Sequence, residues 1–470
     1  MTSNEKSARA LAGLGGLLLL AGIGIRISNA LRFRADLGFD ALGNLQYLQH
    51  LQSTWALPSP EALWSSAHPP FFYYCAALIW RGLTAVGLES LVLPVLALSI
   101  SAVGLLVIAA IANWMRRADP DDGLRWLLAV GLILFLPVHL YMSPMIGEEM
   151  VHAALVAWVL VLAARSMPDL PGPGEAAWIG GLCGLALLTK LSGGLVAAAV
   201  VFAWLLAGAR TGRLATALSR VALMGGMTAL VGGWFYAYTW ASHGYLYAQD
   251  LAIHQEIFTL PPGERGILDY LRVPLATWTD PQLLNPDLLG SVWGSTYATI
   301  FFDGHRHFLP NSPGVSRMGT AILVLALVPT AAFLVGLARG MRRAIAEPGG
   351  RDSLLIAMVV FSLAGYAVFT WGNPWFVTLK GSYLLGLCVP FALYTSEVLA
   401  GWLRGPGAGA KWVAAAMGVL ALLVALTFTL GPVFNKRDRG IHKETQAAVA
   451  LPPDLAQPLR VRGPVAGAPS

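Results

Sequence analysis

Charged residues are scarce in this chain of 470 residues: Asp, Glu, Lys and Arg together make up 12%, whereas 56% of the residues are hydrophobic. With a mean hydropathy of +0.63, this composition excludes an ordinary soluble domain and is typical of a polytopic membrane protein. Cysteine is scarcer still. Cys75, Cys183 and Cys388 lie scattered in apolar stretches, a pattern that indicates neither a disulfide framework nor a metal cluster.

Acidic residues are fewer than basic ones, which leaves a formal net charge of +6. The basic residues cluster between hydrophobic runs, where they determine membrane topology, so we expect no nucleic-acid partner. The first run, Leu11–Ile27, follows Lys6 and Arg9 and could be a secretory signal with a cleavage site near Ser28–Ala30. We favour an uncleaved first span, because many further spans follow it.

Apolar segments near the length that a bilayer requires recur along the chain and predict an all-α membrane protein of about 11 spans. The predicted spans are Leu11–Ile27, Leu91–Trp114, Leu124–Met142, Met150–Ala164, Ala176–Leu188, Leu191–Gly208, Leu218–Trp240, Met318–Leu337, Leu354–Trp371, Ser382–Ala400 and Trp412–Leu430. Segment Phe71–Val86 is short and contains Arg81. We interpret it as a helix that lies in the outer interface.

The distribution of basic residues supports an inside N-terminus. The loops then predicted to be cytoplasmic carry Arg116, Arg117, Arg125, Arg210, Arg213, Arg220, Arg339, Arg342, Arg343, Arg351, Arg404 and Lys411, as the positive-inside rule requires. Residues 1–431 form the predicted membrane core, with outer loops 29–70 and 241–316. The polar tail 432–470 is expected to be partly disordered, and its basic residues at the outer face conflict with the rule.

The first outer loop is expected to contain an interfacial helix from Asp40 onward. Asp40, Asn44 and Tyr47 share one face of it at i, i+4, i+7 spacing. That face could bind a polar substrate or could be the solvated side of the helix. His68 precedes two prolines, which end any helix, and it could contact substrate or simply be solvated.

Two adjacent carboxylates, Glu148 and Glu149, precede the apolar helix that begins near Met150. One of them could cap the positive end of that helix. Because adjacent carboxylates repel each other, retaining both indicates a cation or a hydroxyl-rich partner. His152, one turn further on, is predicted to be a packed core histidine.

Two lysines stand at predicted outer helix ends: Lys190 between two apolar helices, and Lys380, with Tyr383 one turn on. Such a lysine either extends its amine to the interface or pairs with an anion such as a lipid phosphate. In the second outer loop, Asp303 lies two and four residues before histidines, a weak metal-binding signal. The aromatic residues around it suit an interfacial belt.

These features, taken in order, resemble the C-type glycosyltransferase superfamily. An acidic first outer loop, His-Pro-Pro before an aromatic helix, "LYMSPMIGEE", "GLALLTKLSG" and "KGSYLLGL" follow one another between about Arg26 and Leu393. The nearest likeness is to bacterial relatives of protein O-mannosyltransferases and to the aminoarabinose transferases of lipid A. The resemblance implies an enzyme that takes a sugar from a polyprenyl-phosphate carrier at the non-cytoplasmic face of the plasma membrane.

The resemblance also implies roles for particular residues. Asp40 best matches the family's loop-one aspartate, with Asp36 as the alternative; Asn44 stands where many relatives have histidine, and Ser382 replaces an arginine of the late motif. The second acidic site falls on Glu148 and Glu149. Any Mg²⁺ or Mn²⁺ would be held there, although adjacent acids differ from the acid-x-acid metal site of oligosaccharyltransferases.

The expected chemistry follows from the leaving group. A lipid phosphate departs readily, so the acceptor hydroxyl needs a base, for which Asp40 is the candidate. Lys190, Lys380 or a bound cation would neutralise the departing phosphate, and a single carboxylate base implies inversion at the anomeric carbon. The acceptor is a lipid, a glycan or a protein. A transporter of lipid-linked glycans and a scaffold without activity are the alternatives.

Overall fold

The computed structural model describes residues 3–248, 251–254, 261–281, 285–310 and 312–434 of the chain. Within these ranges the backbone forms helices joined by loops, with one isolated bridge between Pro262 and Trp375. The all-α prediction is therefore confirmed. The tail predicted to be partly disordered lies almost entirely outside the described residues, because helix α21 ends at Phe434.

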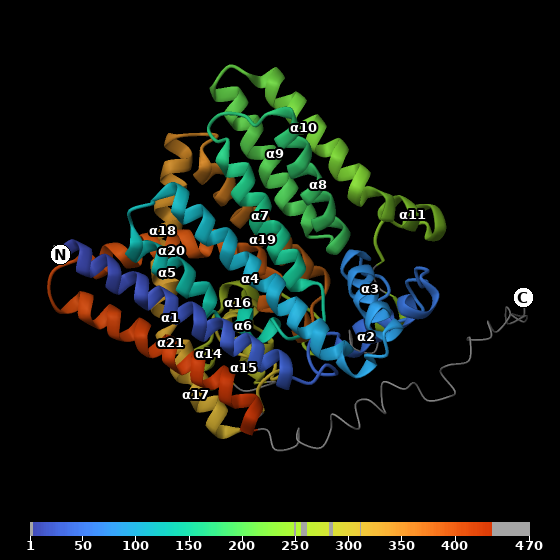
Figure 1. Ribbon diagram of the computed structural model, residues 1–470, viewed down its shortest axis with the longest axis horizontal. Coiled ribbons are helices and arrows are strands. Elements are labelled where there is room, and N and C mark those ends of the chain that lie inside the picture. Colours follow the sequence, from blue (N-terminus) through green and yellow to red (C-terminus); the bar gives the residue numbers. More distant parts are fainter. Residues whose placement is uncertain (1–2, 249–250, 255–260, 282–284, 311, 435–470) are drawn as a thin grey trace, which may run out of the picture.

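The membrane core is built from long apolar helices (Figure 1). They are α1 (Ser3–Arg32), α4 (Val92–Ala118), α5 (Gly123–Leu134), α7 (Glu149–Arg165), α8 (Pro173–Thr189), α9 (Gly193–Arg210), α10 (Leu214–Thr228), α11 (Trp234–His243), α17 (Pro313–Leu325), α18 (Leu327–Ala346), α19 (Arg351–Gly372), α20 (Cys388–Arg404) and α21 (Ala408–Phe434). In Figure 1, α8, α9 and α10 form one group, while α1 and α21 run side by side.

Shorter elements make up the connections. They are α2 (Ala41–Thr54), α3 (Phe71–Ala85), η1 (Glu89–Leu91), α6 (Pro137–Met142), η2 (Ala229–Gly233), η3 (Ala252–His254), α13 (Leu268–Leu271), α14 (Ala276–Thr279), α15 (Pro286–Leu289), α16 (Val292–Phe301), η4 (Phe376–Thr378) and η5 (Gly381–Leu387). Helix α2 confirms the helix predicted after Asp40, and α3 is the short helix predicted to follow the two prolines.

Each of the eleven predicted spans coincides with one or more helices. Eight helical stretches of the described residues are long and apolar enough to cross a membrane, which makes this a multi-pass membrane protein. The predicted span Leu124–Met142 is divided into α5 and α6, because Pro137 cannot continue a helix and instead begins the next one. Helices α7 and α8 have 17 residues each, so the total of eleven stays a prediction.

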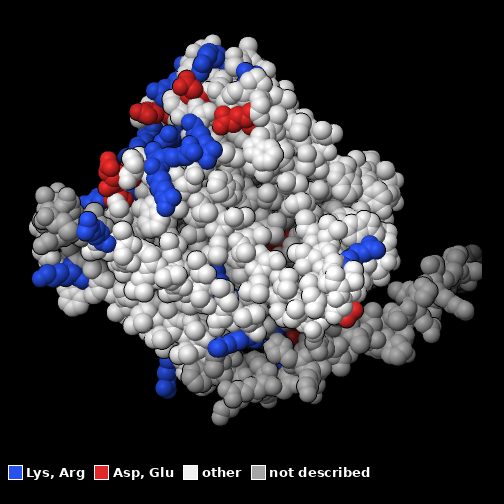
Figure 2. Space-filling view, viewed as in Figure 1, with Lys and Arg blue, Asp and Glu red and all other residues white. Residues whose placement is uncertain are grey.

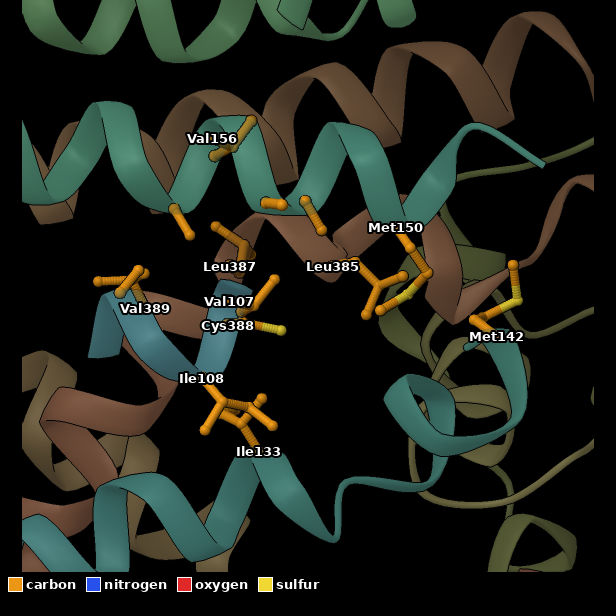
Figure 3. Close-up of a cluster of buried hydrophobic side chains, with 14 of the residues drawn as sticks. Val107, Ile108, Ile133, Met142, Met150, Val156, Leu385, Leu387, Cys388 and Val389 are labelled. Carbon is orange, nitrogen blue, oxygen red and sulfur yellow. The ribbon is translucent and has the colours of Figure 1, made fainter. Parts of the chain in front are cut away.

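A continuous apolar core joins the helices that carry the outer loops (Figure 3). Val107 and Ile108 of α4 meet Val156 of α7, Ile133 of α5, and Val389 at the start of α20, and all five side chains are buried. Close packing of this kind tolerates little change in side-chain volume. It therefore fixes the start of α7 against η5, the two segments that present Glu149 and Lys380.

Charged side chains gather at the ends of the helices. Figure 2 shows a band of uncharged surface across the middle of the molecule, with most Lys and Arg residues grouped beside it at one end. The last turns of α4, α7, α9, α18 and α20 each contain arginine, and α19 begins at Arg351. An uncharged band between charged ends is expected of a protein that spans a bilayer.

The opposite end is formed by the two outer loops. Helices α2 and α3 pack against each other there. The second loop reaches the segment before η5, where the amide of Phe376 donates a hydrogen bond to the carbonyl of Pro261 (3.0 Å). Segments far apart in the sequence, the first loop, the start of α7, the α8–α9 turn and the start of η5, meet at this end.

Candidate active site

The Asp40 carboxylate lies at the centre of this end of the molecule. Its Oδ2 is 3.1 Å from the amine of Lys380, which is 340 residues away in the chain, and its Oδ1 accepts a hydrogen bond of 2.9 Å from the indole of Trp64. Asp40 precedes α2 with φ 56° and ψ 18°, a left-handed backbone conformation that is uncommon for a residue other than glycine. Its side chain makes no capping bond to α2. The carboxylate is instead directed toward Lys380.

The surroundings of Asp40 favour its charged form. Burial raises the pKa of the carboxyl group, but the charges of Lys380 and His68 and the hydrogen bonds from Trp64 and Lys380 outweigh burial. The pKa is therefore held well below its ordinary value. In this arrangement Asp40 is an ionised but weak base.

Lys380 reaches Asp40 because the chain after it passes unusually close to α16. A Cβ atom on Gly381 would lie 2.6 Å from the side chain and 2.7 Å from the backbone nitrogen of Ile300, so only glycine fits there. The Gly381 amide also donates to the hydroxyl of Thr299 (2.8 Å). The Lys380 side chain is 9% exposed, and its amine lies 4.8 Å from the centre of the Phe39 ring.

A hydrogen-bonded chain connects the first loop with the start of α7. The Tyr73 hydroxyl donates to Oδ1 of Asn44 (2.7 Å) and also lies 3.3 Å from Oε2 of Glu148. Nδ1 of His68 is 3.1 Å from the same hydroxyl and 3.4 Å from Oε1 of Glu148. The Asn44 amide in turn donates to the carbonyl of Ile146 (2.9 Å). Asn44, His68 and Glu148 therefore belong to one network.

The adjacent carboxylates share a lysine. The Lys190 amine is 2.9 Å from Oε1 of Glu149 and 3.8 Å from Oε1 of Glu148. Burial would raise the pKa of Glu148, but the charges of His68 and Lys190 lower it. For Lys190, burial is outweighed by the two glutamates, and its pKa is raised. The repulsion expected between neighbouring acids is thus compensated inside the protein.

Tyr383 lies between the two lysines. The amine of Lys190 is 4.6 Å and that of Lys380 is 5.6 Å from the centre of its ring, distances at which a cation is attracted to the ring face. We name Asp40, Glu148, Glu149, Lys190 and Lys380 the acid–lysine cluster. Two ammonium groups of this cluster therefore lie close to one aromatic ring.

Two residues predicted for the site, Asp36 and Tyr47, lie at its margin. Asp36 pairs with Arg34 (2.5 Å) and with neither lysine. Tyr47 is fully buried, stacks on Tyr73 with ring centres 4.2 Å apart, and lines a narrow apolar cavity that Phe235 and Tyr247 also line.

Asp303 lies in the loop after α16. It accepts backbone hydrogen bonds from His307 (3.2 Å), Phe308 (2.8 Å) and Leu309 (2.7 Å), so both of its oxygens stabilise its own loop. It pairs with neither lysine, and its binding role stays a prediction. His152 is buried and lies 3.2 Å from the hydroxyl of Ser192, as expected of a packed core histidine.

Sequence reasoning missed Phe39, Trp64 and Tyr73. Tyr73 connects three site residues, and only its place in the aromatic run after the two prolines could have suggested it. Trp64 contacts Asp40 across 24 positions that include helix α2 and the irregular loop after it, and no periodic signal relates the two residues. Phe39 was missed because an apolar residue gives no chemical sign of a binding site. Its ring packs against the Lys380 amine and against His307 (4.4 Å between ring centres).

The donor set around Glu148 and Glu149 does not fit a divalent cation. No group of three or more His, Cys, Asp and Glu side chains suited to a metal occurs in the described ranges. One oxygen of each glutamate already contacts Lys190, and the oxygens of Glu148 also contact His68 and Tyr73.

Comparison with known proteins identifies the fold. No family model and no curated protein matches the sequence. The structure is similar to that of ArnT from Cupriavidus metallidurans bound to undecaprenyl phosphate, with a TM-score of 0.51, 14% identity, and coverage of 93% of this chain and 78% of that one. It is also similar to the Archaeoglobus fulgidus oligosaccharyltransferase in complex with zinc and sulfate, with a TM-score of 0.50, 14% identity, and coverage of 88% and 53%.

Both of these proteins have the C-type glycosyltransferase fold. The fold that the sequence resemblance predicts is therefore confirmed. This chain spans about half of the oligosaccharyltransferase chain, and at 14% identity the likeness establishes the fold alone.

Proposed function

We propose that this protein is a membrane glycosyltransferase that moves a sugar from a polyprenyl-phosphate carrier to a hydroxyl of a lipid, glycan or protein acceptor. The observation that carries the proposal is the acid–lysine cluster, in which a candidate base, Asp40, lies 3.1 Å from a candidate phosphate ligand, Lys380. ArnT, with the same fold, was crystallised with undecaprenyl phosphate, which supports this class of donor. The active site would face the non-cytoplasmic side of the plasma membrane, opposite the arginine-rich helix ends.

The two lysines suit a phosphate leaving group. Their amines face Tyr383 from 4.6 and 5.6 Å, so a phosphate bound there would contact both cations. Cations fixed where negative charge develops stabilise a transition state without reorganising at the moment of reaction. Lys190 and Lys380 would therefore neutralise the departing carrier phosphate, and Asn44 and His68 would orient the sugar or the acceptor.

Donor binding would also activate the base. A phosphate would attract the Lys380 amine away from Asp40, and the loss of that charge would raise the pKa of the carboxyl group because Lys380 is the largest of the causes that lower it. Asp40 would then accept the proton of the acceptor hydroxyl as the hydroxyl oxygen attacks the anomeric carbon. The carbon–oxygen bond to the phosphate breaks, and the carrier phosphate leaves with the electron pair. One displacement without a carboxylate nucleophile inverts the anomeric centre.

A lipid-linked glycan transporter is the second candidate. Transporters carry their charged sites near the bilayer midplane, between internal repeats. The acid–lysine cluster lies instead at the ends of α7 and α8 and in loops, which favours catalysis at one face. A scaffold that kept the fold without activity remains the third candidate, since Ser382 replaces the arginine expected in the late motif.

The test is release of sugar from a panel of radiolabelled polyprenyl-phosphate and polyprenyl-diphosphate sugars, with membrane extract added as a source of acceptor. The purified protein is compared with Asp40→Asn and, as a matched control, with Asp36→Asn on the same loop. We expect one donor to be consumed, a loss of about 100-fold to 10,000-fold in Asp40→Asn, as general-base catalysis predicts, and little loss in Asp36→Asn.

Two other measurements separate the alternatives. Donor binding by Asp40→Asn should survive, because Lys190 and Lys380 remain. Equal background release by all three proteins across the whole panel would contradict the enzyme. Carrier translocation in reconstituted vesicles without turnover would then identify the transporter.

A further inference from the structure

A second polar site lies at the opposite end of α7 from the acid–lysine cluster. Helix α7 runs for 17 residues from Glu149 to Arg165, a length of about 25 Å. At its far end, a cavity of about 140 Å³ opens between the end of α4, the end of α7 and the start of α19. Its walls include Trp114, Val161 and Ala164 together with Arg117, Arg165 and Arg351. We name it the arginine pocket.

The three arginines of this pocket have almost no internal partners. Arg165 donates one hydrogen bond to the side chain of Asn113 (3.1 Å), and Arg351 donates one to the carbonyl of Ala164 (3.3 Å). No described carboxylate is ion-paired with any of the three. Glu175 acts on Arg165 only at longer range, and the charge of Arg117 opposes it. Since a guanidinium carries five N–H donors, most of theirs are unused.

Neighbouring arginines at the same end of the molecule behave differently. Arg343 pairs with both Asp352 and Glu397 (2.8 and 2.9 Å), and Arg404 pairs with Asp122 (2.5 Å). The positive-inside rule accounts for arginine on this side of the membrane. It does not account for three arginines from three helices converging unpaired on one cavity, because topology requires only that each be present in its loop.

We propose that the arginine pocket binds the phosphate headgroup of an anionic membrane lipid. Three guanidiniums from separate helices can bind phosphate oxygens through paired N–H groups, and the free volume is well above the roughly 10–15 Å³ that one water needs. The apolar part of the wall, Trp114, Val161 and Ala164, suits the glycerol and acyl portion of a lipid.

The location favours a lipid over a soluble anion. The pocket is at the polar ends of three membrane helices, where α4 and α7 end and α19 begins. Basic pockets between membrane helices on the predicted cytoplasmic side are typical headgroup sites. A bound lipid would also relieve the repulsion between Arg117 and Arg165. This inference does not depend on the proposed glycosyl transfer.

The experiment measures lipid binding to the full-length protein in detergent. Thermal stabilisation and native mass spectrometry are recorded with phosphatidylglycerol, with phosphatidylcholine and with inorganic phosphate. The test variant is Arg117→Gln/Arg165→Gln/Arg351→Gln. The matched control is Arg116→Gln/Arg339→Gln/Arg342→Gln, which removes the same charge from exposed residues of the same end that do not line the pocket. The single variant Arg117→Gln is included because this side chain makes no hydrogen bond within the described chain.

We expect phosphatidylglycerol to bind the unmodified protein and the control equally. The triple variant should bind roughly 100-fold more weakly and Arg117→Gln alone about fivefold more weakly, as expected from the contribution of each basic residue near an anionic lipid. The single variant keeps the test decisive if the triple variant does not fold. Unchanged affinity in Arg117→Gln, equal stabilisation by phosphatidylcholine, or equal stabilisation by inorganic phosphate would each overturn the proposal.

Discussion

The charged side chains at the two ends of α7 differ in whether they form ion pairs within the protein. At one end, Glu149 lies 2.9 Å from Lys190 with side-chain exposures of 10% and 20%. At the other end, Arg165 is exposed and without a carboxylate partner among the described residues. Buried charges are costly unless they are paired, whereas charges in water or at a lipid surface need no internal partner. Paired and unpaired charges therefore indicate different uses for the two ends.

In the acid–lysine cluster, a bound ligand can take the place of an internal ion-pair partner. A phosphate could replace Asp40 as the partner of Lys380, at the cost of one internal ion pair. In the arginine pocket, a phosphate would replace only water. The first site therefore suits a substrate that must leave again, and the second suits a lipid that stays.

The largest expected effect comes from removing the shared cation. Lys190→Met would leave Glu149 buried without its ion-pair partner and Glu148 with His68 alone, and breaking a buried pair costs about 3–5 kcal/mol. Thermal unfolding in detergent should show this loss, while Lys411→Met, an exposed lysine at the start of α21, should show little. Adding Glu149→Gln to Lys190→Met should restore part of the stability. Equal stability of the two lysine variants would contradict the pairing.

The next effect concerns the base. Lys380→Met removes the charge that most lowers the pKa of Asp40. The carboxylate of the free enzyme should then take up its proton at higher pH, so the acidic limb of the kcat/KM profile should move up by about 1–3 pH units. Lys380→Arg keeps the charge and should leave the limb in place. An unmoved limb in Lys380→Met would show that Asp40 is not the group that titrates, whatever the loss in rate.

Much of the fold could be predicted from the sequence, because apolar length and arginine placement report directly on membrane spans. The predicted span Leu124–Met142 differs most from the structure, because Pro137 divides it into two helices. Hydropathy averaged over a window of residues does not reveal such a proline. The positions of Asn44, Glu148 and Lys190 in one network were predicted in outline because loops on one side of the membrane must meet there.

The pairings themselves could not be predicted. Lys380 reaches Asp40 across 340 residues, and only the close packing at Gly381 brings them together. Asp303 was predicted as a site residue because an acid near two histidines is a pattern seen in binding sites. Its oxygens are used by three backbone amides of its own loop, a role that depends on loop geometry and leaves no sequence signal.

A smaller effect should appear in the pH dependence of stability. Burial lowers the pKa of His68, but Glu148 raises it above its ordinary 6.5; this contribution is complete below pH 6.5 and is lost as pH rises through the folded-state pKa. The pKa of Glu148 is lowered from 4.5, so its contribution is complete above pH 4.5 and is lost as pH falls. The stability difference between the unmodified protein and Glu148→Gln should therefore be largest between pH 4.5 and 6.5.

The size of that difference should be about 1.5–3 kcal/mol, as for a hydrogen bond to a charged group. Unfolding temperatures measured from pH 4 to 9 would provide it. His68→Gln should flatten the same profile on its alkaline side. A difference that does not vary with pH would show that Glu148 acts through packing and that its ion pair with His68 contributes nothing.

The smallest effect is expected where an ion pair is fully in water. Arg213 lies 3.0 Å from Asp169 at the arginine-rich end, with side-chain exposures of 47% and 81%. Screening by solvent should limit its contribution to about 0.5 kcal/mol or less, so Arg213→Gln should unfold at nearly the temperature of the unmodified protein. The same substitution at Arg117 is expected to weaken lipid binding. Comparing the two variants therefore distinguishes an arginine that forms an internal ion pair from one that binds a ligand. If Arg213→Gln destabilises the protein as strongly as Lys190→Met, then solvent exposure does not determine how much an ion pair contributes to stability here. The contrast drawn between paired and unpaired charges at the two ends of α7 would then be wrong.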